Sequence, residues 1–187
     1  MVSLVQLWLP IVLSAVLVFV ASSLIHMVLK YHNSDYKKLS NEDAVRAALN
    51  AGNPTPGQYI MPYGVGPSAM KDPEMVRKFT EGPVGQLILR PSGPPTMGSF
   101  MGQWFVYTLV ISLLTALVAA HTVSRGAGQQ YIFHVVGLVA FLGYAGSQAQ
   151  YAIWAGQPWS STLKSIFDGL IYALVTAGTF MLLWPRM

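Results

Sequence analysis

LVQLWLPIVLSAVLVFVASSLIHMVL, residues 4–29, decides the class of this protein. The stretch contains no Asp, Glu, Lys or Arg, and it is longer than the roughly 20 residues that a helix needs to cross a bilayer core. A secretory signal peptide would begin with a basic region, and its apolar centre would span only about 7–15 residues. The stretch therefore predicts a transmembrane helix that is retained.

Three more apolar runs follow later in the chain, at about 104–122, 131–154 and 163–184. They are continuously apolar instead of alternating, and a spanning segment must satisfy its own backbone hydrogen bonds, so helices are favoured over strands. The sequence thus predicts an all-α integral membrane protein with four transmembrane helices. A small mixed cap is expected on the cytoplasmic side, between the first and second helices.

This pattern divides the chain into three parts: transmembrane helix 1 at 1–29, a cytoplasmic loop or cap at 30–103, and a three-helix transmembrane unit at 104–187. The short connections inside the last part predict antiparallel neighbours. The first helix is tethered by a long loop. It can therefore pack beside the other three or reach a neighbouring subunit.

The composition limits the kinds of function. Charged residues make up 10% of the chain, against about 25% in an ordinary soluble domain. The chain has no cysteine, which excludes disulfides, thiolate metal sites and covalent CxxCH haem. Its basic residues are mixed with acidic ones and form no run longer than two, so nucleic acid is not an expected partner. The expected partners are the lipid bilayer and other membrane subunits or further copies of the chain.

The distribution of basic residues predicts the orientation. Eight of the eleven Lys and Arg residues lie between Lys30 and Arg90, and Lys164 raises the count on that side to nine, whereas the other side holds only Arg125 and Arg186. Positively charged loops stay in the cytoplasm, so both termini are predicted outside and the large loop inside. The tryptophans are predicted to mark the two interfaces, with Trp8 and Trp184 outside and Trp104, Trp154 and Trp159 inside.

The large loop carries signals of local structure. Residues 41–50 predict a short helix with Ser40 as its N-cap, and Asp72 with Pro73 predicts the start of a second helix. Residues 84–90 are the best candidate for a strand. The loop also contains apolar side chains that a flexible linker would lack. We therefore expect an ordered cap that packs on the bundle or on a partner.

The first candidate site lies where the first helix leaves the membrane. His26, His32 and Asp35 are all residue types that bind metals. His26 and His32 are six residues apart, so they would point in different directions on one continuous helix. A metal site would require the helix to end between them. The alternative is an interfacial helix end whose side chains meet lipid headgroups.

A second histidine pair, His121 and His134, is predicted at the facing ends of the second and third spans. The pair could supply two ligands to a metal or to a haem, but two ligands do not complete a site. His26 is predicted on the opposite side of the membrane and cannot complete it. The alternative is that both histidines bond to headgroups or to neighbouring helices.

Ionisable and amide side chains lie near the cytoplasmic ends of the last two spans. Lys164 and Asp168 are four residues apart, which predicts an ion pair with Lys164 extending toward the cytoplasm. The alternative is that Asp168 is a buried group in an ion path, because an ionisable residue within a span is a functional hypothesis. Gln148 and Gln150, expected at the same depth, support that alternative.

Small residues in the spans predict close helix packing and not a pore. They are Ser112, Thr115, Thr176, Thr179, Gly137, Gly143, Gly146 and Gly178.

The chain contains no HExxH, GxSxG, Walker A or GxGxxG motif, so the sequence favours a protein that is not an enzyme. The leading hypothesis is a non-catalytic accessory or organising subunit of a bacterial inner-membrane assembly, with no cofactor. One alternative is an oligomeric transporter or channel that uses Asp168. Another is a metal- or haem-binding membrane protein that uses His26/His32 or His121/His134. A lipid-modifying enzyme has only the Ser22/His26 and His32/Asp35 pairs in its favour.

Overall fold

The structure is a computed structural model that describes residues 2–64 and 66–185. It is mostly helical, and the four predicted membrane-length segments are confirmed. They are Leu4–Leu29, Met97–Thr122, Gln129–Ala155 and Trp159–Leu183.

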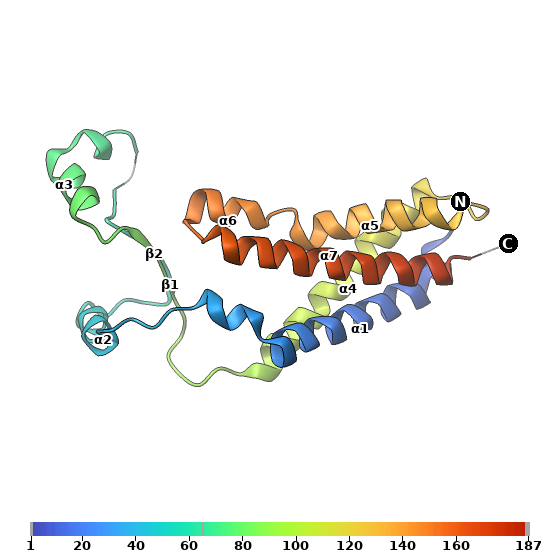
Figure 1. Ribbon diagram of the computed structural model, residues 1–187, viewed down its shortest axis with the longest axis horizontal. Coiled ribbons are helices and arrows are strands. Elements are labelled where there is room, and N and C mark those ends of the chain that lie inside the picture. The colour runs from blue at the N-terminus through green and yellow to red at the C-terminus, as the bar shows by residue number, and fades with distance from the viewer. Residues whose placement is uncertain (1, 65, 186–187) are drawn as a thin grey trace.

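The first and third of these segments are not uniform α-helices. The first consists of a 3-10 turn at Leu4–Leu7, helix α1 at Trp8–Ser23 and a π-helical turn at Leu24–Leu29. The third breaks at Gly146 and Ser147 into α5 (Gln129–Ala145) and α6 (Gln148–Ala155). The second and fourth are single helices, α4 (Met97–Thr122) and α7 (Trp159–Leu183). In Figure 1, α1, α4, α5 and α7 form one bundle, with the N- and C-terminal ends at the same end of it.

Hydrogen bonds hold the two ends of the chain to the α4–α5 turn. Arg125 Nη2 donates to Gln6 Oε1 at 2.9 Å, and Trp184 Nε1 donates to the Ser124 carbonyl at 3.1 Å. These contacts confirm that both chain ends lie beside this turn. Arg186, which enters the charge count above, lies outside the described residues.

Helix α1 packs on its own bundle, so the structure resolves the alternative left open by its long tether. The hydroxyls of Ser14 and Ser112 lie 2.5 Å apart, and Ser112 Oγ is 2.9 Å from the Ile11 carbonyl. Thr108 Oγ1 lies 3.4 Å from the Ala15 carbonyl. Such polar contacts between apolar helices are a common means of association in membranes.

The hydrophobic core has two parts. One lies at the end with the termini and includes Leu7, Ile132 and Phe180. The other includes Val18, Tyr144 and Tyr172 and lies toward the large loop. Outside both parts the bundle presents large apolar side chains, which suits a surface in contact with lipid.

Most of the predicted packing residues lie between helices. Ser112, Thr115 and Thr176 are fully buried. A methyl group added at Gly137 would contact Ala177, and one at Gly143 would crowd Ile111. The prediction is wrong for two of the glycines, as explained next.

Gly178 and Gly146 do not serve interhelical packing. A methyl group at Gly178 would meet no atom within 4 Å, because this residue points away from the other helices. At Gly146 it would lie 2.5 Å from the Leu142 carbonyl of its own chain segment, so this glycine accommodates the break between α5 and α6. Close approach of α5 to α7 is instead seen at Gly169, where an added Cβ would lie 2.7 Å from Ala145 Cβ.

The loop contains two helices and a two-stranded antiparallel sheet, which partly confirms the prediction. The elements are α2 (Glu42–Ala51), β1 (Gly57–Met61), α3 (Pro73–Glu81) and β2 (Gly85–Leu89). Strands β1 and β2 are antiparallel, with Gly57 opposite Leu89 and Met61 opposite Gly85. Strand β1 is absent from the sequence-based prediction.

The two helix starts in the loop have different outcomes. Asp72 caps α3 as predicted, because its side chain accepts a hydrogen bond from the Glu74 amide at 3.0 Å. The prediction of Ser40 as the cap of α2 is wrong. The residue before α2 is Asn41, and α2 has no side-chain cap hydrogen bond.

Most of the loop does not pack on the bundle. Its first turn, Tyr31–Asp35, is hydrogen-bonded to α7. None of the described residues between 36 and 100 is buried. In Figure 1, α2, α3 and the two strands lie beyond the end of the bundle opposite the termini. Packing of the cap on the bundle is therefore wrong for the described residues after this turn, and packing on a partner stays a prediction.

The tryptophans differ in exposure, and their predicted interfacial arrangement stays a prediction. The exposed ones are Trp8, Trp154 and Trp159. Trp104 instead donates its indole N–H to Ser22 Oγ at 2.7 Å, and Trp184 is 3% exposed. These two stabilise contacts inside the protein.

Candidate metal centre

The first transmembrane segment ends at Lys30, at the loop end of the bundle. The π-helical turn Leu24–Leu29 closes with a 3.0 Å hydrogen bond from the Lys30 amide to the Ile25 carbonyl. Lys30 has φ 52° and ψ 21°, the left-handed conformation that reverses the chain after a helix. A 3-10 turn at Tyr31–Asp35 follows. The helix therefore ends between His26 and His32, which is the condition for a shared site.

The chain reversal brings the two imidazoles together. The rings of His26 and His32 are stacked, with centroids 4.9 Å apart and planes 4° from parallel. On an uninterrupted helix these side chains would diverge. The backbone at Lys30 thus accounts for their convergence.

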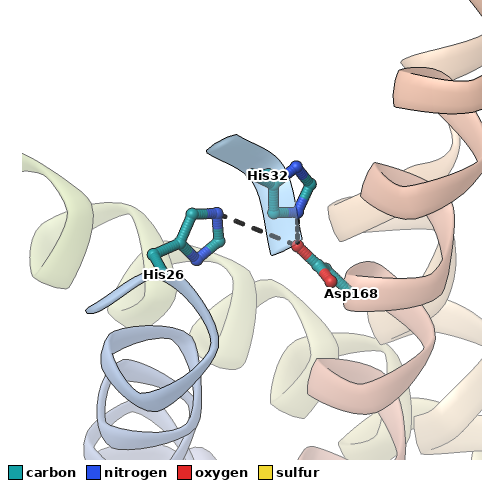
Figure 2. A group of neighbouring side chains, drawn as sticks. All are labelled: His26, His32 and Asp168. Atoms are coloured by element: carbon teal, nitrogen blue, oxygen red, sulfur yellow. Dashed lines mark hydrogen bonds and ion pairs between the residues drawn. The ribbon is translucent and has the colours of Figure 1, made fainter. Parts of the chain in front are cut away.

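Asp168 faces both imidazoles from α7. Its side chain accepts a hydrogen bond from the Tyr31 hydroxyl, and its Oδ2 lies 2.8 Å from His32 Nε2. His26 Nε2 lies 3.8 Å from the same oxygen. Figure 2 shows the two rings, His26 at the end of the first segment and His32 on the turn that follows it, directed at the carboxylate of Asp168 in α7. Ligand atoms of all three residues lie within 4.8 Å of one another.

Each imidazole has a second partner on its other nitrogen. His26 Nδ1 lies 3.0 Å from the Ser22 carbonyl, and His32 Nδ1 lies 2.8 Å from Asp35 Oδ2. A carbonyl or an ionised carboxylate can only accept, so each Nδ1 carries a proton. In the neutral rings the lone pair is then on Nε2, the atom that faces Asp168. Metal-binding histidines are held by this same arrangement.

Lys164 does not pair with Asp168, so that prediction is wrong. Its ammonium group lies 2.6 Å from Asp35 Oδ1, 2.7 Å from Ser34 Oγ and 3.0 Å from the Tyr31 carbonyl. The loop segment folds back over α7 and offers the lysine three acceptors outside the helix. The hydrogen bond from Lys164 holds the pKa of the Asp35 carboxyl below its ordinary value.

The site therefore combines two groups of residues that lie far apart in the sequence, His26 to Asp35 and Lys164 to Asp168. Asp168 is 4% exposed and Asp35 contributes a second carboxylate, while Lys164 supplies one ammonium group. If both imidazoles are neutral, these three charges sum to −1. A bound cation, or one added proton, would balance that charge, and burying an unbalanced charge is costly.

A cavity of about 700 Å³ adjoins the site. Asp168, His26 and Gln148 belong to its lining, together with aromatic side chains from five helices, α1, α4, α5, α6 and α7. Gln150 does not line it and is exposed, because successive positions of α6 point in different directions. Gln148 and Asp168 therefore line the same cavity and Gln150 does not, while the ion path expected from these residues stays a prediction.

The second histidine pair forms no comparable group. His121 and His134 are both exposed. His121 Nδ1 lies 2.8 Å from the Leu117 carbonyl of its own helix, and His134 contacts the edge of Phe133. Among the described residues, the groups of three or more metal-binding side chains reduce to His26, His32 and Asp168.

Sequence reasoning missed Tyr31, which donates to Asp168, and the buried tyrosines Tyr144 and Tyr172 of the cavity. One available signal was their position. Tyr144 and Tyr172 are phenols within otherwise apolar spans, where a hydroxyl requires a partner.

No known protein family, curated protein or solved structure matches this chain. Its function has to be argued from the geometry alone.

Proposed function

We propose that this multi-pass membrane protein binds one divalent transition-metal ion through His26 Nε2, His32 Nε2 and the Asp168 carboxylate. The carrying observation is that both Nε2 atoms face one buried carboxylate while both Nδ1 atoms are held by acceptors. Imidazole and carboxylate ligands suit Zn²⁺ and the neighbouring first-row ions.

The spacing of the ligand atoms supports a metal. Two ligand atoms on a tetrahedral ion, each about 2.1 Å from it, are roughly 3.4 Å apart. The separations here are 2.8 Å from His32 Nε2 and 3.8 Å from His26 Nε2 to Asp168 Oδ2, on either side of that value. Directing both Nε2 lone pairs at one ion also requires the two rings, which are stacked with planes 4° from parallel, to rotate toward a common point.

Three protein ligands leave part of the coordination sphere for a further ligand. Sites of that kind are typically catalytic or exchangeable, whereas structural zinc sites are closed by four protein ligands. Asp168 and His26 also line the cavity, so an additional ligand would approach from there.

The test is metal binding by protein purified in mild detergent and stripped with a chelator. We expect one Co²⁺ or Zn²⁺ per chain, with visible d–d bands for Co²⁺. His32→Ala and Asp168→Asn should abolish the bands, and His26→Ala should weaken them strongly. The matched controls are His121→Ala and His134→Ala, which should retain full binding.

Two results would overturn the proposal. One is a protein that binds no Co²⁺ at micromolar concentrations. The other is loss of binding in the His121 or His134 variants and not in the first group. A Soret band in the purified protein would instead support haem at the second pair.

A second role is favoured by the exposed loop. Several of its large apolar side chains lie in solvent, including Tyr36 (84% exposed), Tyr63 (74%) and Ile88 (67%). Exposed apolar surface of this kind often marks a protein contact. It supports the hypothesis of an accessory or organising subunit, which a fixed partner co-purifying with the chain would test.

The proposed location is a bacterial inner membrane, with both termini outside and the large loop in the cytoplasm. The chain has no cysteine, so single cysteines can be introduced without background. A membrane-impermeant thiol reagent added to spheroplasts should label Ser124→Cys and spare Ser92→Cys. The reverse labelling pattern would show that the topology is the opposite of the one proposed.

The transporter alternative predicts that Asp168→Asn abolishes flux while the protein still folds.

A further inference from the structure

The cavity beside Asp168 has the size of a small-molecule site. Its volume is about 700 Å³, within the roughly 300–1,000 Å³ typical of ligand pockets. Most of its wall is apolar, and residues of α1, α4, α5 and α7 contribute to it.

Four aromatic rings form one side of the cavity. Tyr172 lies 5.9 Å from Trp104 and 5.5 Å from Tyr144, both edge to face, and Tyr107 is stacked on Trp104 at 5.4 Å. Rings in such arrangements present flat apolar surfaces and edges to whatever occupies the space. They favour a planar ring over a flexible acyl chain.

Two of these rings carry hydroxyls that have no hydrogen-bond partner among the described residues, Tyr144 and Tyr172. Both side chains are buried, at 6% and 4% exposure. Of the neighbouring polar groups, Tyr107 donates to the Gly143 carbonyl at 2.8 Å and Trp104 to Ser22 at 2.7 Å. The Thr176 hydroxyl, which lies near that of Tyr144, donates to the Tyr172 carbonyl at 2.8 Å. Buried polar groups are normally hydrogen-bonded, so each unpaired hydroxyl requires an explanation.

We propose that the cavity binds a lipid-soluble molecule with a planar ring bearing carbonyl oxygens, of the quinone class, through the Tyr144 and Tyr172 hydroxyls. The Tyr144 and Tyr172 hydroxyls can each donate a hydrogen bond to an acceptor oxygen of the ligand. The surrounding aromatic rings favour a planar ligand. Asp168 also lines the cavity, but its carboxylate accepts from Tyr31 and lies against His26 and His32, so the carbonyl oxygens of an uncharged ligand are directed to the two tyrosine hydroxyls. The inference goes beyond the metal site and does not rest on it.

The test is equilibrium binding of radiolabelled decylubiquinone to the metal-free full chain in nanodiscs. We expect saturable binding by the wild type, and about tenfold weaker binding or worse in Tyr144→Phe/Tyr172→Phe, which loses two hydrogen bonds. The variant should unfold no earlier than the wild type, since the lost hydroxyls have no protein partner. The single variants supply the same comparison if the double variant does not fold.

Thr162→Val is the matched control. Thr162 carries another buried hydroxyl without a partner among the described residues, and it does not line the cavity. Its removal should leave decylubiquinone binding unchanged. Equal binding by the wild type and the double tyrosine variant would overturn the proposal, and so would uptake that never saturates. Because the protein is metal-free, neither result depends on whether His26, His32 and Asp168 bind a metal.

Discussion

Replacing Asp35 tests whether a residue that hydrogen-bonds to the proposed metal ligand His32 contributes to metal affinity. Asp35 has no place among the three ligands, but it accepts from His32 Nδ1 at 2.8 Å and from Lys164 at 2.6 Å. Outer partners of metal-binding histidines typically contribute about 10- to 100-fold in affinity. Asparagine keeps one oxygen for His32, but it turns N–H donors toward the lysine. We therefore expect about a tenfold loss of Co²⁺ affinity for Asp35→Asn, and nearer 100-fold for Asp35→Ala.

The assay is a competitive Co²⁺ titration of purified protein between pH 6 and 8. The Lys164 hydrogen bond lowers the pKa of Asp35 from 3.8, so this carboxylate is ionised throughout that range. A depressed carboxyl pKa stabilises the fold above pH 3.8 and ceases to do so as the pH falls through the lower, folded-state value. Protonation of Asp35 itself should therefore add no pH dependence to the ratio of wild-type to variant affinities in the assay.

The matched control for this experiment is Asp43→Asn. Asp43 lies in α2 with a fully exposed side chain, 3.9 Å from Arg46. Its replacement should leave Co²⁺ affinity unchanged. The reasoning is refuted if Asp35→Asn binds Co²⁺ as tightly as the wild type, or if both variants weaken binding equally.

Two further predictions concern the bundle. Gly169→Ala should destabilise the protein by about 1–3 kcal/mol in detergent unfolding, because the added Cβ would lie 2.7 Å from Ala145 Cβ. Gly178→Ala, the control, should be neutral. Equal stability of the two variants would contradict the packing described. A double-mutant cycle of Ser14→Ala and Ser112→Ala should give a coupling of about 0.6 kcal/mol from their 2.5 Å contact, and additive effects would show that this contact does not hold α1.

The spans could be predicted from the sequence because hydropathy over some 20 residues is a strong signal. The β1 strand could not. GQYIM, residues 57–61, is short, follows a Pro- and Gly-rich turn and becomes a strand only by pairing with β2. Local propensity carries little information about such pairing.

The candidate site was predictable in its parts and not in its assembly. Asp168 was identifiable as an ionisable residue in a span, and His26 and His32 as a nearby pair. Their convergence depends on Lys30 adopting φ 52°, a conformation usually taken by Gly or Asn. A lysine gives no sign of it. The fold also joins residues 136 positions apart, as in the His32–Asp168 contact, and no local pattern specifies that distance.

The local stability of the site is set by the turn at Tyr31–Asp35 and differs from that of the helices in the bundle. The turn has no buried residue, and side-chain hydrogen bonds to α7, such as that between His32 and Asp168, hold it in place. Segments with few buried contacts open at a lower free energy than the helices beneath them. Local opening of these five residues would withdraw His32 and Tyr31 from Asp168 while the bundle stays folded. In hydrogen exchange, the amides of this turn should therefore lose protection well before those of α7.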